Sequence, residues 1–287
     1  MDPKKTLLHV PHWRKDKYDQ NFPCYEASPE GESYIKKAQK MGYIVAPHAN
    51  AFEIDPQNPA YQLLGQFEYR EIETDKRLGW SIFREEEGGI STSPGVPMSD
   101  RRLMTTRDCN TMTKIHPGQP MWHSILRESL QKAKRAHGLD CIFTDITLCT
   151  FNLNNSLVND MTTTEGAKQL HQYLAKIDGG LWLGGEGLNE ITMQTQIFAQ
   201  THLFRSHQIN CEGLERVVSV PIGEFLWGKL CRTIGYSRLN GDSEHDILRM
   251  KIHEDHGAIP TITCRTAAEI ENPCPGIKRQ FELAKKG

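Results

Sequence analysis

Short apolar segments alternate with amphipathic segments along most of this chain, and this alternation limits the folds open to it more than any other feature. Segments of strand length and apolar character lie at Thr6–Trp13, Tyr43–His48, Leu139–Ile146 and Leu181–Gly184. The segments between them carry apolar residues at helical spacing. Strands that alternate with helices form a parallel sheet connected by right-handed crossovers. The sequence therefore predicts an α/β protein.

The helical segments are indicated by their periodicity and by the residues that end them. Ser33–Met41 and Trp122–His137 are followed by Gly42 and Gly138, and glycine commonly ends a helix. Trp122–His137 places its apolar residues on one stripe, with Lys and Arg opposite. Further helices are expected near Glu165–Lys176, near Thr192–Thr201 and at Ile277–Lys285, and further strands at Arg216–Ile222 and Ala258–Cys264.

The length of 287 residues favours a closed barrel, because α/β barrels commonly use about 250 residues as one domain. We predict one (β/α)₈ TIM-type barrel over residues 1–287, with an open doubly wound sheet as the less favoured alternative. Residues 51–120 are rich in Pro, Gly and charge and are expected to form a long, loop-rich elaboration, with a hairpin around Leu78–Arg84. The barrel is thus expected to be irregular around its third unit.

Charge and motifs exclude several classes of function. The 34 Lys and Arg against 36 Asp and Glu lack the basic excess that nucleic acids require. No apolar run approaches the roughly 18 residues of a membrane span, and the start has no secretory apolar region. No glycine-rich nucleotide motif opens a βα unit, so no cofactor is expected. The eight cysteines form no Cys-x-x-Cys pair, which argues against a structural zinc site. The cellular compartment is not predicted.

Polar residues at the predicted strand ends are the candidates for function, because barrel active sites form at the C-terminal ends of the strands. Asp145 and Glu186 each follow an apolar run directly, where an ionised carboxylate is costly unless something compensates it. On successive βα units, these two carboxylates are expected to face each other across the barrel mouth. The other candidates are His9, His12, Trp13, His48, Asn50, Asp55, Glu190, His202 and His253.

A facing pair of carboxylates suits glycoside hydrolysis. One carboxylate attacks the anomeric carbon or activates water, while the other protonates the leaving oxygen. Burial and a negative neighbour keep the proton on that second group near neutral pH by raising its pKa. Trp13 is expected to stack on the sugar, with Trp80, Trp122 and Trp227 as further stacking candidates, and His and Asn side chains to bind its hydroxyls. The expected partner is therefore a carbohydrate.

Several of these segments resemble glycoside-hydrolase-like TIM barrels of the DUF6259 type. The resemblance lies in His9–Trp13 (HVPHW), Asp19–Pro23 (DQNFP) and Lys40–Asn50 (KMGYIVAPHAN) with Asp55. It continues in Gly138–Asp145 (GLDCIFTD), which follows Trp122 and is similar to the pattern Gly-x-Asp-Gly-x-Tyr-x-Asp of related barrels, and in Gly184–Glu190 (GGEGLNE). It spans most of residues 6–265.

The resemblance implies Asp145 as the nucleophile or stabilising carboxylate, Glu186 as the general acid/base, and a retaining mechanism. One departure concerns the end of the second strand, where Tyr and Asn are common in such barrels and this chain has His48 before Asn50. That difference affects the expected contacts with the bound sugar. Larger relatives also carry flanking β-sandwich domains, for which this chain has no room.

Three alternatives remain open from the sequence. Glu190 competes with Glu186 for the acid role. The histidines could furnish a metal site in a hydrolytic metal-dependent barrel, although His9 and His12 lack the His-x-His spacing that points both rings to one side of a strand. The third alternative is a carbohydrate-binding barrel without catalysis, because a fold alone does not fix chemistry.

Overall fold

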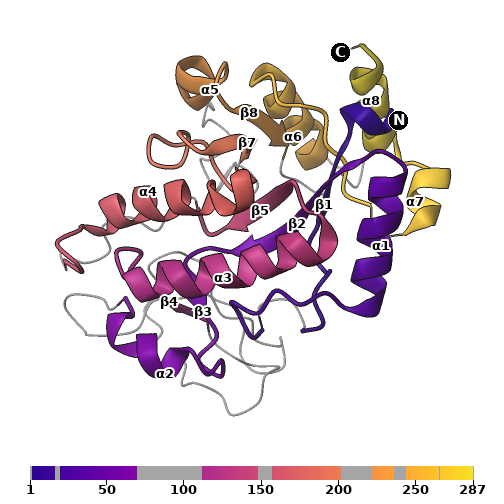
Figure 1. Cartoon of the computed structure of the whole chain (residues 1–287). Helices are drawn as coiled ribbons and strands as arrows, with labels where there is room; N and C mark the ends of the chain where they lie inside the picture. The colour runs from indigo at the N-terminus through magenta and orange to yellow at the C-terminus, as the bar shows by residue number, and fades with distance from the viewer. Residues whose placement is uncertain are drawn as a thin grey trace, which may run out of the picture. The chain divides into compact units, whose positions relative to one another are not determined.

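The computed structural model describes residues 2–16, 20–69, 112–147, 157–201, 222–235, 244–264 and 266–286 (Figure 1). The expected hairpin at Leu78–Arg84, the residues of Arg216–Ile222 before its last, and His202 lie outside these ranges. Contacts along the chain divide it into two compact units, Asp2–Gly184 and Gly185–Gly287, which are described separately.

The unit Asp2–Gly184 contains a sheet with the strand order β1-β2-β5-β6. The strands are β1 (Leu7–Val10), β2 (Ile44–Asn50), β5 (Cys141–Asp145) and β6 (Trp182–Gly185). β1 and β5 both pair with β2 in parallel. These strands match the four predicted apolar segments, so the α/β class is confirmed.

Three helices connect these strands: α1 (Pro29–Lys40), α3 (Pro120–His137) and α4 (Thr163–Leu174). They confirm the predicted helices near these positions. α1 begins earlier than predicted because the Ser28 hydroxyl accepts the Gly31 N–H at 2.9 Å and Pro29 occupies the first helical position. α3 ends at Gly138, whose φ of 61° lies in the left-handed region.

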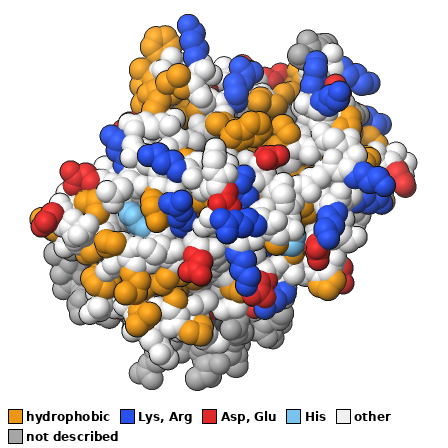
Figure 2. Space-filling view, in the orientation of Figure 1, with side chains coloured by type: hydrophobic (Ala, Val, Ile, Leu, Met, Phe, Trp, Pro, Cys, Tyr) orange, Lys and Arg blue, Asp and Glu red, His pale blue; other side chains and the backbone are white. Residues whose placement is uncertain are grey.

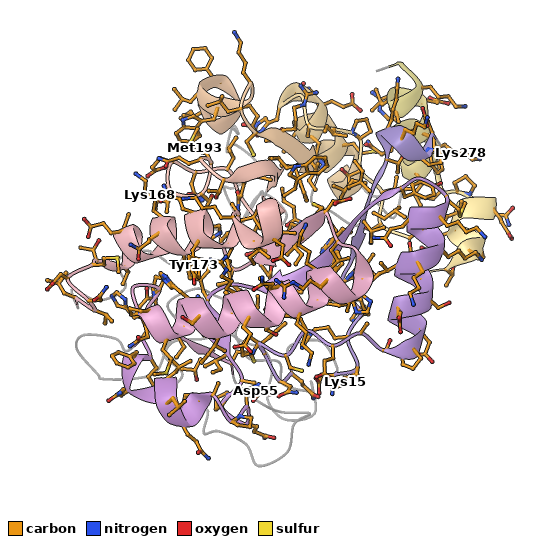
Figure 3. All side chains as sticks on the ribbon, viewed as in Figure 1. Lys15, Asp55, Lys168, Tyr173, Met193 and Lys278 are labelled. Atoms are coloured by element: carbon orange, nitrogen blue, oxygen red, sulfur yellow. The ribbon has the colours of Figure 1, made fainter. Side chains whose placement is uncertain are left out.

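The helices contact one another and the sheet through specific side chains. The Gln39 amide of α1 donates to the carbonyls of His137 and Gly138 at the end of α3 (3.1 and 3.0 Å). Tyr173 of α4, labelled in Figure 3, lies under the Arg127 guanidinium of α3 at 4.4 Å. α3 thus contacts both α1 and α4.

The described ends of the predicted elaboration at 51–120 contain short elements. β3 (Glu53–Ile54) pairs antiparallel with β4 (Thr113–Lys114), and one helical turn, α2 (Tyr61–Leu64), continues into the 3₁₀ turn η2 (Gly65–Phe67). Two further 3₁₀ turns of this unit are η1 (Pro3–Lys5) and η5 (Ile177–Gly179). The β3–β4 pair joins the two described ends of the elaboration directly after β2.

The unit Gly185–Gly287 begins with a correction to the sequence prediction. Residues near Thr192–Thr201 do not form a helix: turns continue to Thr195, and β7 (Gln196–Thr201) follows. Asn189 Oδ1 accepts the N–H groups of Ile191 and Thr192 (3.0 and 3.1 Å), an alternative to helical bonding. β7 then pairs in parallel with β8 (Arg232–Gly235).

The remaining elements of this unit are α5 (Ile222–Trp227), α6 (Glu244–Asp255), α7 (Ala267–Glu271) and α8 (Pro275–Lys286). α8 confirms the predicted closing helix. The expected strand Ala258–Cys264 is wrong as a full strand, because only Ile259 forms a bridge, to Ile234. Pro260 follows at once and has no N–H to continue a ladder.

α5 differs from the other helices in its exposed apolar side chains. Ile222, Phe225 and Leu226 are all exposed, Phe225 by 88 %, and they form the hydrophobic surface over α5 at the upper left of Figure 2. This helix therefore contributes little to the core of its unit. No described helix has both the length and the apolar character to cross a lipid bilayer.

Candidate functional site

Predicted site residues gather on one face of the sheet formed by β1, β2 and β5. The register aligns Asn50 with Asp145, His48 with Phe143, and His9 with Ala46, two residues before His48. Because side chains alternate along a strand, His9, His48, Asn50 and Asp145 all leave the sheet on the same side. The ring centroids of His9 and His48 lie 5.7 Å apart. The chain thus brings four of its predicted site residues together.

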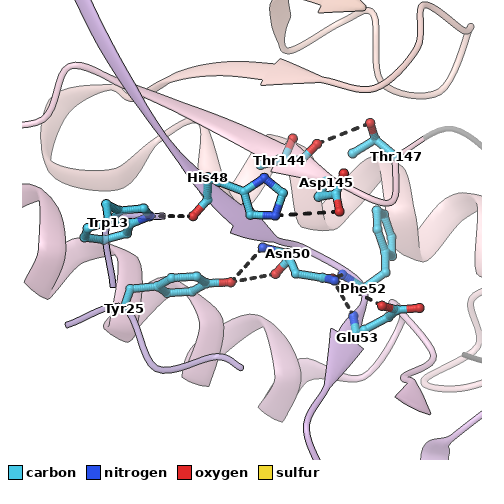
Figure 4. A network of polar contacts seen from close by, with 9 residues as sticks. All are labelled: Trp13, Tyr25, His48, Asn50, Phe52, Glu53, Thr144, Asp145 and Thr147. Atoms are coloured by element: carbon cyan, nitrogen blue, oxygen red, sulfur yellow. Dashed lines mark hydrogen bonds and ion pairs between the residues drawn. The ribbon is translucent and has the colours of Figure 1, made fainter. Parts of the chain in front are cut away.

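The last polar residue of β5 lies beside a histidine of β2. Asp145 Oδ2 is 3.6 Å from His48 Nε2 (Figure 4). The Asp145 side chain is 14 % exposed, whereas that of His48 is only 2 % exposed. Burial holds the pKa of His48 well below its usual value, and electrostatic interactions with His9, Arg14 and His12 lower it further. A neutral imidazole therefore faces the carboxylate.

The neighbouring histidine of β1 is also neutral. Burial lowers the pKa of His9 to about 4. Its ring packs on Phe143 with centroids 4.4 Å apart, and its Nε2 has no hydrogen-bond partner among the described residues. Two uncharged imidazole rings and the Phe143 ring thus lie on the same side of the sheet as Asp145.

Asn50, at the end of β2, uses its amide to shape the turn that follows. Its Oδ1 accepts the N–H groups of Phe52 and Glu53 at 3.1 and 2.9 Å, and its Nδ2 donates to Glu53 Oε2 at 3.1 Å. The Tyr25 hydroxyl donates to the Asn50 carbonyl at 2.7 Å and accepts the Asn50 N–H at 3.0 Å (Figure 4). Burial raises the pKa of Tyr25, so it remains a phenol. Asn50 is therefore a structural anchor beside Asp145.

Glu53 is a residue that the sequence reasoning missed. It is buried, with 1 % of its surface exposed, and its carboxylate contacts the Asn50 amide. The available signal was a single charge within the otherwise apolar Ala51–Ile54, directly after a strand. Such a charge needs hydrogen-bond partners close by, and Asn50 supplies one of them.

Two tryptophans that were candidates for sugar stacking are buried instead. Trp13 is fully buried, stacks in parallel with Tyr25 and donates its indole N–H to the His48 carbonyl at 2.8 Å. Trp122 of α3 is also fully buried and donates to the Ala51 carbonyl at 3.0 Å. Both rings hold the C-terminal end of β2 and present no exposed face. Trp80 lies outside the described residues, and Trp227 lies half-buried on α5.

Asp55 and His12 lie outside strands β1, β2 and β5. Asp55, labelled in Figure 3, is completely buried, and its carboxylate accepts the N–H groups of Asn21 and Gln57 at 2.5 and 2.7 Å. It thereby joins two loops. His12 lies in the bend after β1 and is exposed to solvent.

The remaining candidates belong to the unit Gly185–Gly287. Glu186 directly follows β6 and is half-buried, while Glu190 is exposed in the turn that follows. His253 of α6 is buried against the end of β8, where a Cβ added to Gly235 would lie 2.9 Å from the His253 Nδ1. Within the first unit, the Thr144 hydroxyl donates to the Gly184 carbonyl at 2.6 Å and so fixes the strand that leads to Glu186.

The histidines that the structure describes do not form a cluster suited to a metal ion. Within the described part of the chain, no group of three His, Cys, Asp or Glu side chains is placed to hold an ion. His256 Nδ1 lies 3.8 Å from Glu224 Oε1. The described geometry therefore adds no support to the metal-dependent alternative.

Comparisons with known proteins come from structure alone. No protein-family model matches the sequence, and no curated protein sequence does. The ligand-free α-N-acetylgalactosaminidase of Bifidobacterium bifidum is 15 % identical over 97 % of this chain and 42 % of its own, with a TM-score of 0.62. Its complex with GalNAc gives 14 % identity, the same coverage and a TM-score of 0.64.

The fold is also similar to that of a second glycoside hydrolase. The α-galactosidase of Lactobacillus brevis is 10 % identical over 98 % of this chain and 36 % of its own, with a TM-score of 0.53. This chain thus spans about two-fifths of the length of these structures. At such low identity the similarity establishes the fold and nothing finer. The chain has a glycoside-hydrolase-like α/β fold.

Proposed function

We propose that this protein is a glycoside hydrolase in which Asp145 and Glu186 are the two working carboxylates. The observation that carries the proposal is the placement of Asp145: a partly exposed carboxylate at the C-terminal end of a parallel strand, beside the neutral ring of His48. Active sites of α/β barrels form at these strand ends. The similarity of fold to two glycoside hydrolases supports the same reaction class.

The two carboxylates are proposed to have different roles. Asp145 attacks or stabilises the anomeric carbon, and Glu186 protonates the leaving oxygen and then activates water. We further propose a retaining mechanism, which requires about 5–5.5 Å between the two carboxyl groups, and a complete (β/α)₈ barrel of the DUF6259 type that brings them together. Analysis of the anomeric configuration of the first product by NMR tests the stereochemical proposal.

The sugar contacts are proposed from accessibility. His12 and Glu190 are exposed and can reach a ligand, and His202 remains a candidate from its position in the sequence. The other candidates of the first unit are buried, and we propose that they support the site and do not contact the sugar. They are His9, Trp13, His48, Asn50 and Asp55. The B. bifidum structure was determined with GalNAc, so α-linked galactosaminides and galactosides are the substrates to test first.

The test is a screen of aryl glycosides of both anomers, with three variants measured beside the natural chain. Asp145→Asn and Glu186→Gln are each expected to lower kcat by at least a thousandfold, because each removes a group that makes or breaks a bond. Glu128→Gln, an exposed change of the same kind on α3, is the matched control and should retain full activity. Unchanged hydrolysis in both active-site variants would remove the assignment. Sugar binding without turnover in the natural chain would favour a carbohydrate-binding protein.

A further inference from the structure

His48 and Asp145 are neighbours but differ in their exposure to solvent. The carboxylate of Asp145 is partly exposed, whereas His48 is 2 % exposed and enclosed by side chains. The His48 ring stacks on Phe143 with centroids 5.9 Å apart and lies 6.4 Å from the Phe22 ring. A ligand that reaches Asp145 therefore does not contact His48, and any effect of this histidine on the reaction passes through Asp145.

We propose that His48 is the positioning residue of Asp145, with its Nε2–H directed at Oδ2 to hold the carboxylate in one orientation at the end of β5. The proposal rests on the proposed function, in which Asp145 is a reacting group. Nε2 and Oδ2 are 3.6 Å apart, longer than a formed hydrogen bond, and contacts of this kind often shorten when substrate binds.

The position of the proton on His48 follows from its neighbours. A bare Nε2 lone pair would face a carboxylate oxygen and be repelled by it, so the neutral ring carries its proton on Nε2. The groups that affect its charge are His9 on β1, Arg14 and His12 after β1, and Asp145 on β5. Burial and the three basic groups oppose a second proton on the ring. Asp145 thus gains a hydrogen-bond donor without a full positive charge that would weaken it as a nucleophile.

The backbone and the ring of His48 are both fixed by packing. Trp13 donates to the His48 carbonyl at 2.8 Å, and the rings of His9, Phe22 and Phe143 surround the imidazole. A reacting group is held in place when its supporting residue has its own rotamer locked in this way. β2 thereby determines the orientation of a carboxylate that belongs to β5.

Two substitutions distinguish the effect of the His48 N–H donor from the effect of its ring shape. His48→Phe keeps a planar ring but removes the N–H, and His48→Gln retains an amide N–H donor at a similar reach. We expect His48→Phe to lower kcat by about tenfold to a hundredfold, the range for a lost hydrogen bond to a charged group. KM should stay unchanged, because His48 does not touch the sugar, and His48→Gln should restore most of kcat. A raised KM with normal kcat would instead identify His48 as a sugar contact and overturn the proposal.

A second measurement needs no turnover. The side-chain ¹³C carboxyl resonance of Asp145, identified by its loss in Asp145→Asn, should move in His48→Phe and return towards its original position in His48→Gln. Thermal unfolding of each variant shows that the fold is intact. An unmoved resonance refutes the positioning role even if the protein hydrolyses no glycoside. Full activity in Asp145→Asn refutes the proposed function instead, so the two failures are distinguishable.

Discussion

Asn50 and Asp145 are register partners at the ends of β2 and β5, and their side chains leave the sheet on the same side. The Asn50 amide is committed to Phe52 and Glu53, while the Asp145 carboxylate remains partly exposed. Two polar side chains at neighbouring strand ends thus differ in their surroundings: that of Asn50 is buried in the turn after β2, and that of Asp145 is partly exposed.

This arrangement predicts the result of changing Asn50 to aspartate. Asn50→Asp keeps the acceptor for the Phe52 and Glu53 N–H groups but places an oxygen where Nδ2 now lies 3.1 Å from Glu53 Oε2. Two buried carboxylates in contact cannot both ionise, so one retains a proton in the folded state. The variant should be destabilised by about 4 kcal/mol at neutral pH, because keeping a carboxyl group protonated above its ordinary pKa of about 4 costs about 1.4 kcal/mol per pH unit.

The pH dependence of the destabilisation of Asn50→Asp tests this prediction. Because the folded variant holds a proton that the unfolded chain releases above about pH 4, its stability relative to the natural chain should fall as pH rises. Urea unfolding at pH 4.5 and 7.5 measures this difference. Asn50→Ala removes all three side-chain hydrogen bonds without adding a carboxyl group, so its cost should change less between the two pH values than that of Asn50→Asp. Equal costs for Asn50→Asp would contradict the prediction.

The two buried tryptophans should be needed for stability through their N–H groups. Trp13→Phe leaves the His48 carbonyl without its donor and Trp122→Phe does the same to the Ala51 carbonyl, in fully buried positions. An unsatisfied buried group costs about 1–3 kcal/mol, to which the smaller ring adds a packing loss. Trp182→Phe, at a position that is 50 % exposed, should change the free energy of unfolding by less than about 0.5 kcal/mol. Chemical denaturation of the three variants tests this order.

Two glycines should respond differently to a methyl group. A Cβ at Gly31 would lie 2.1 Å from the Trp13 carbonyl oxygen, a backbone atom that cannot move aside without shifting the chain. Gly31→Ala is therefore expected to cost about 3 kcal/mol or more. Gly138 has open space around it and a φ of +61°, so Gly138→Ala should cost only the backbone strain of about 1–2 kcal/mol. Comparable costs in the two variants would show that α1 can move away from Trp13.

The buried His171 of α4 should make the protein sensitive to acid. Burial lowers its pKa to about 4, from 6.5 in the unfolded chain. Between these values the unfolded state binds the proton and the folded state does not, so stability is complete above pH 6.5 and falls as the pH approaches 4. The difference corresponds to about 3 kcal/mol. His171→Gln should flatten this part of the stability curve, and curves of equal slope for both proteins would contradict the prediction.

Local signals in the sequence were sufficient for much of the fold. The apolar runs of β1, β2, β5 and β6 and the helices ended by Gly42 and Gly138 were predicted because their period and their stop residues lie within a few positions. The placement of Asp145 at a strand end followed from the same reasoning. Features that depend on neighbours within about ten residues could thus be inferred from the sequence.

Features that depend on partners far away in the sequence could not be inferred from it. Trp13 was expected at a sugar-binding surface, but its partner is the carbonyl of His48, 35 residues away, and the sequence gives no sign of that bond. The segment of β7 was expected to be helical. Its strand conformation depends on pairing with β8, which follows after 30 intervening residues. The position of Glu53 beside Asn50 depends on the sharp turn after β2.

α4 carries its own start signal. Thr162 Oγ1 accepts the Glu165 N–H at 3.2 Å, and the Glu165 carboxylate accepts the Thr162 N–H at 2.9 Å. Just before it, Val158 and Met161 exchange two backbone bonds of 3.1 Å around Asn159 and Asp160. A helix that nucleates from its own first turn tolerates insertions upstream of residue 158. The bonds that begin α4 thus lie entirely within residues 158–165, so the start of the helix at Thr163 does not depend on the length of the chain between Asp145 and Val158.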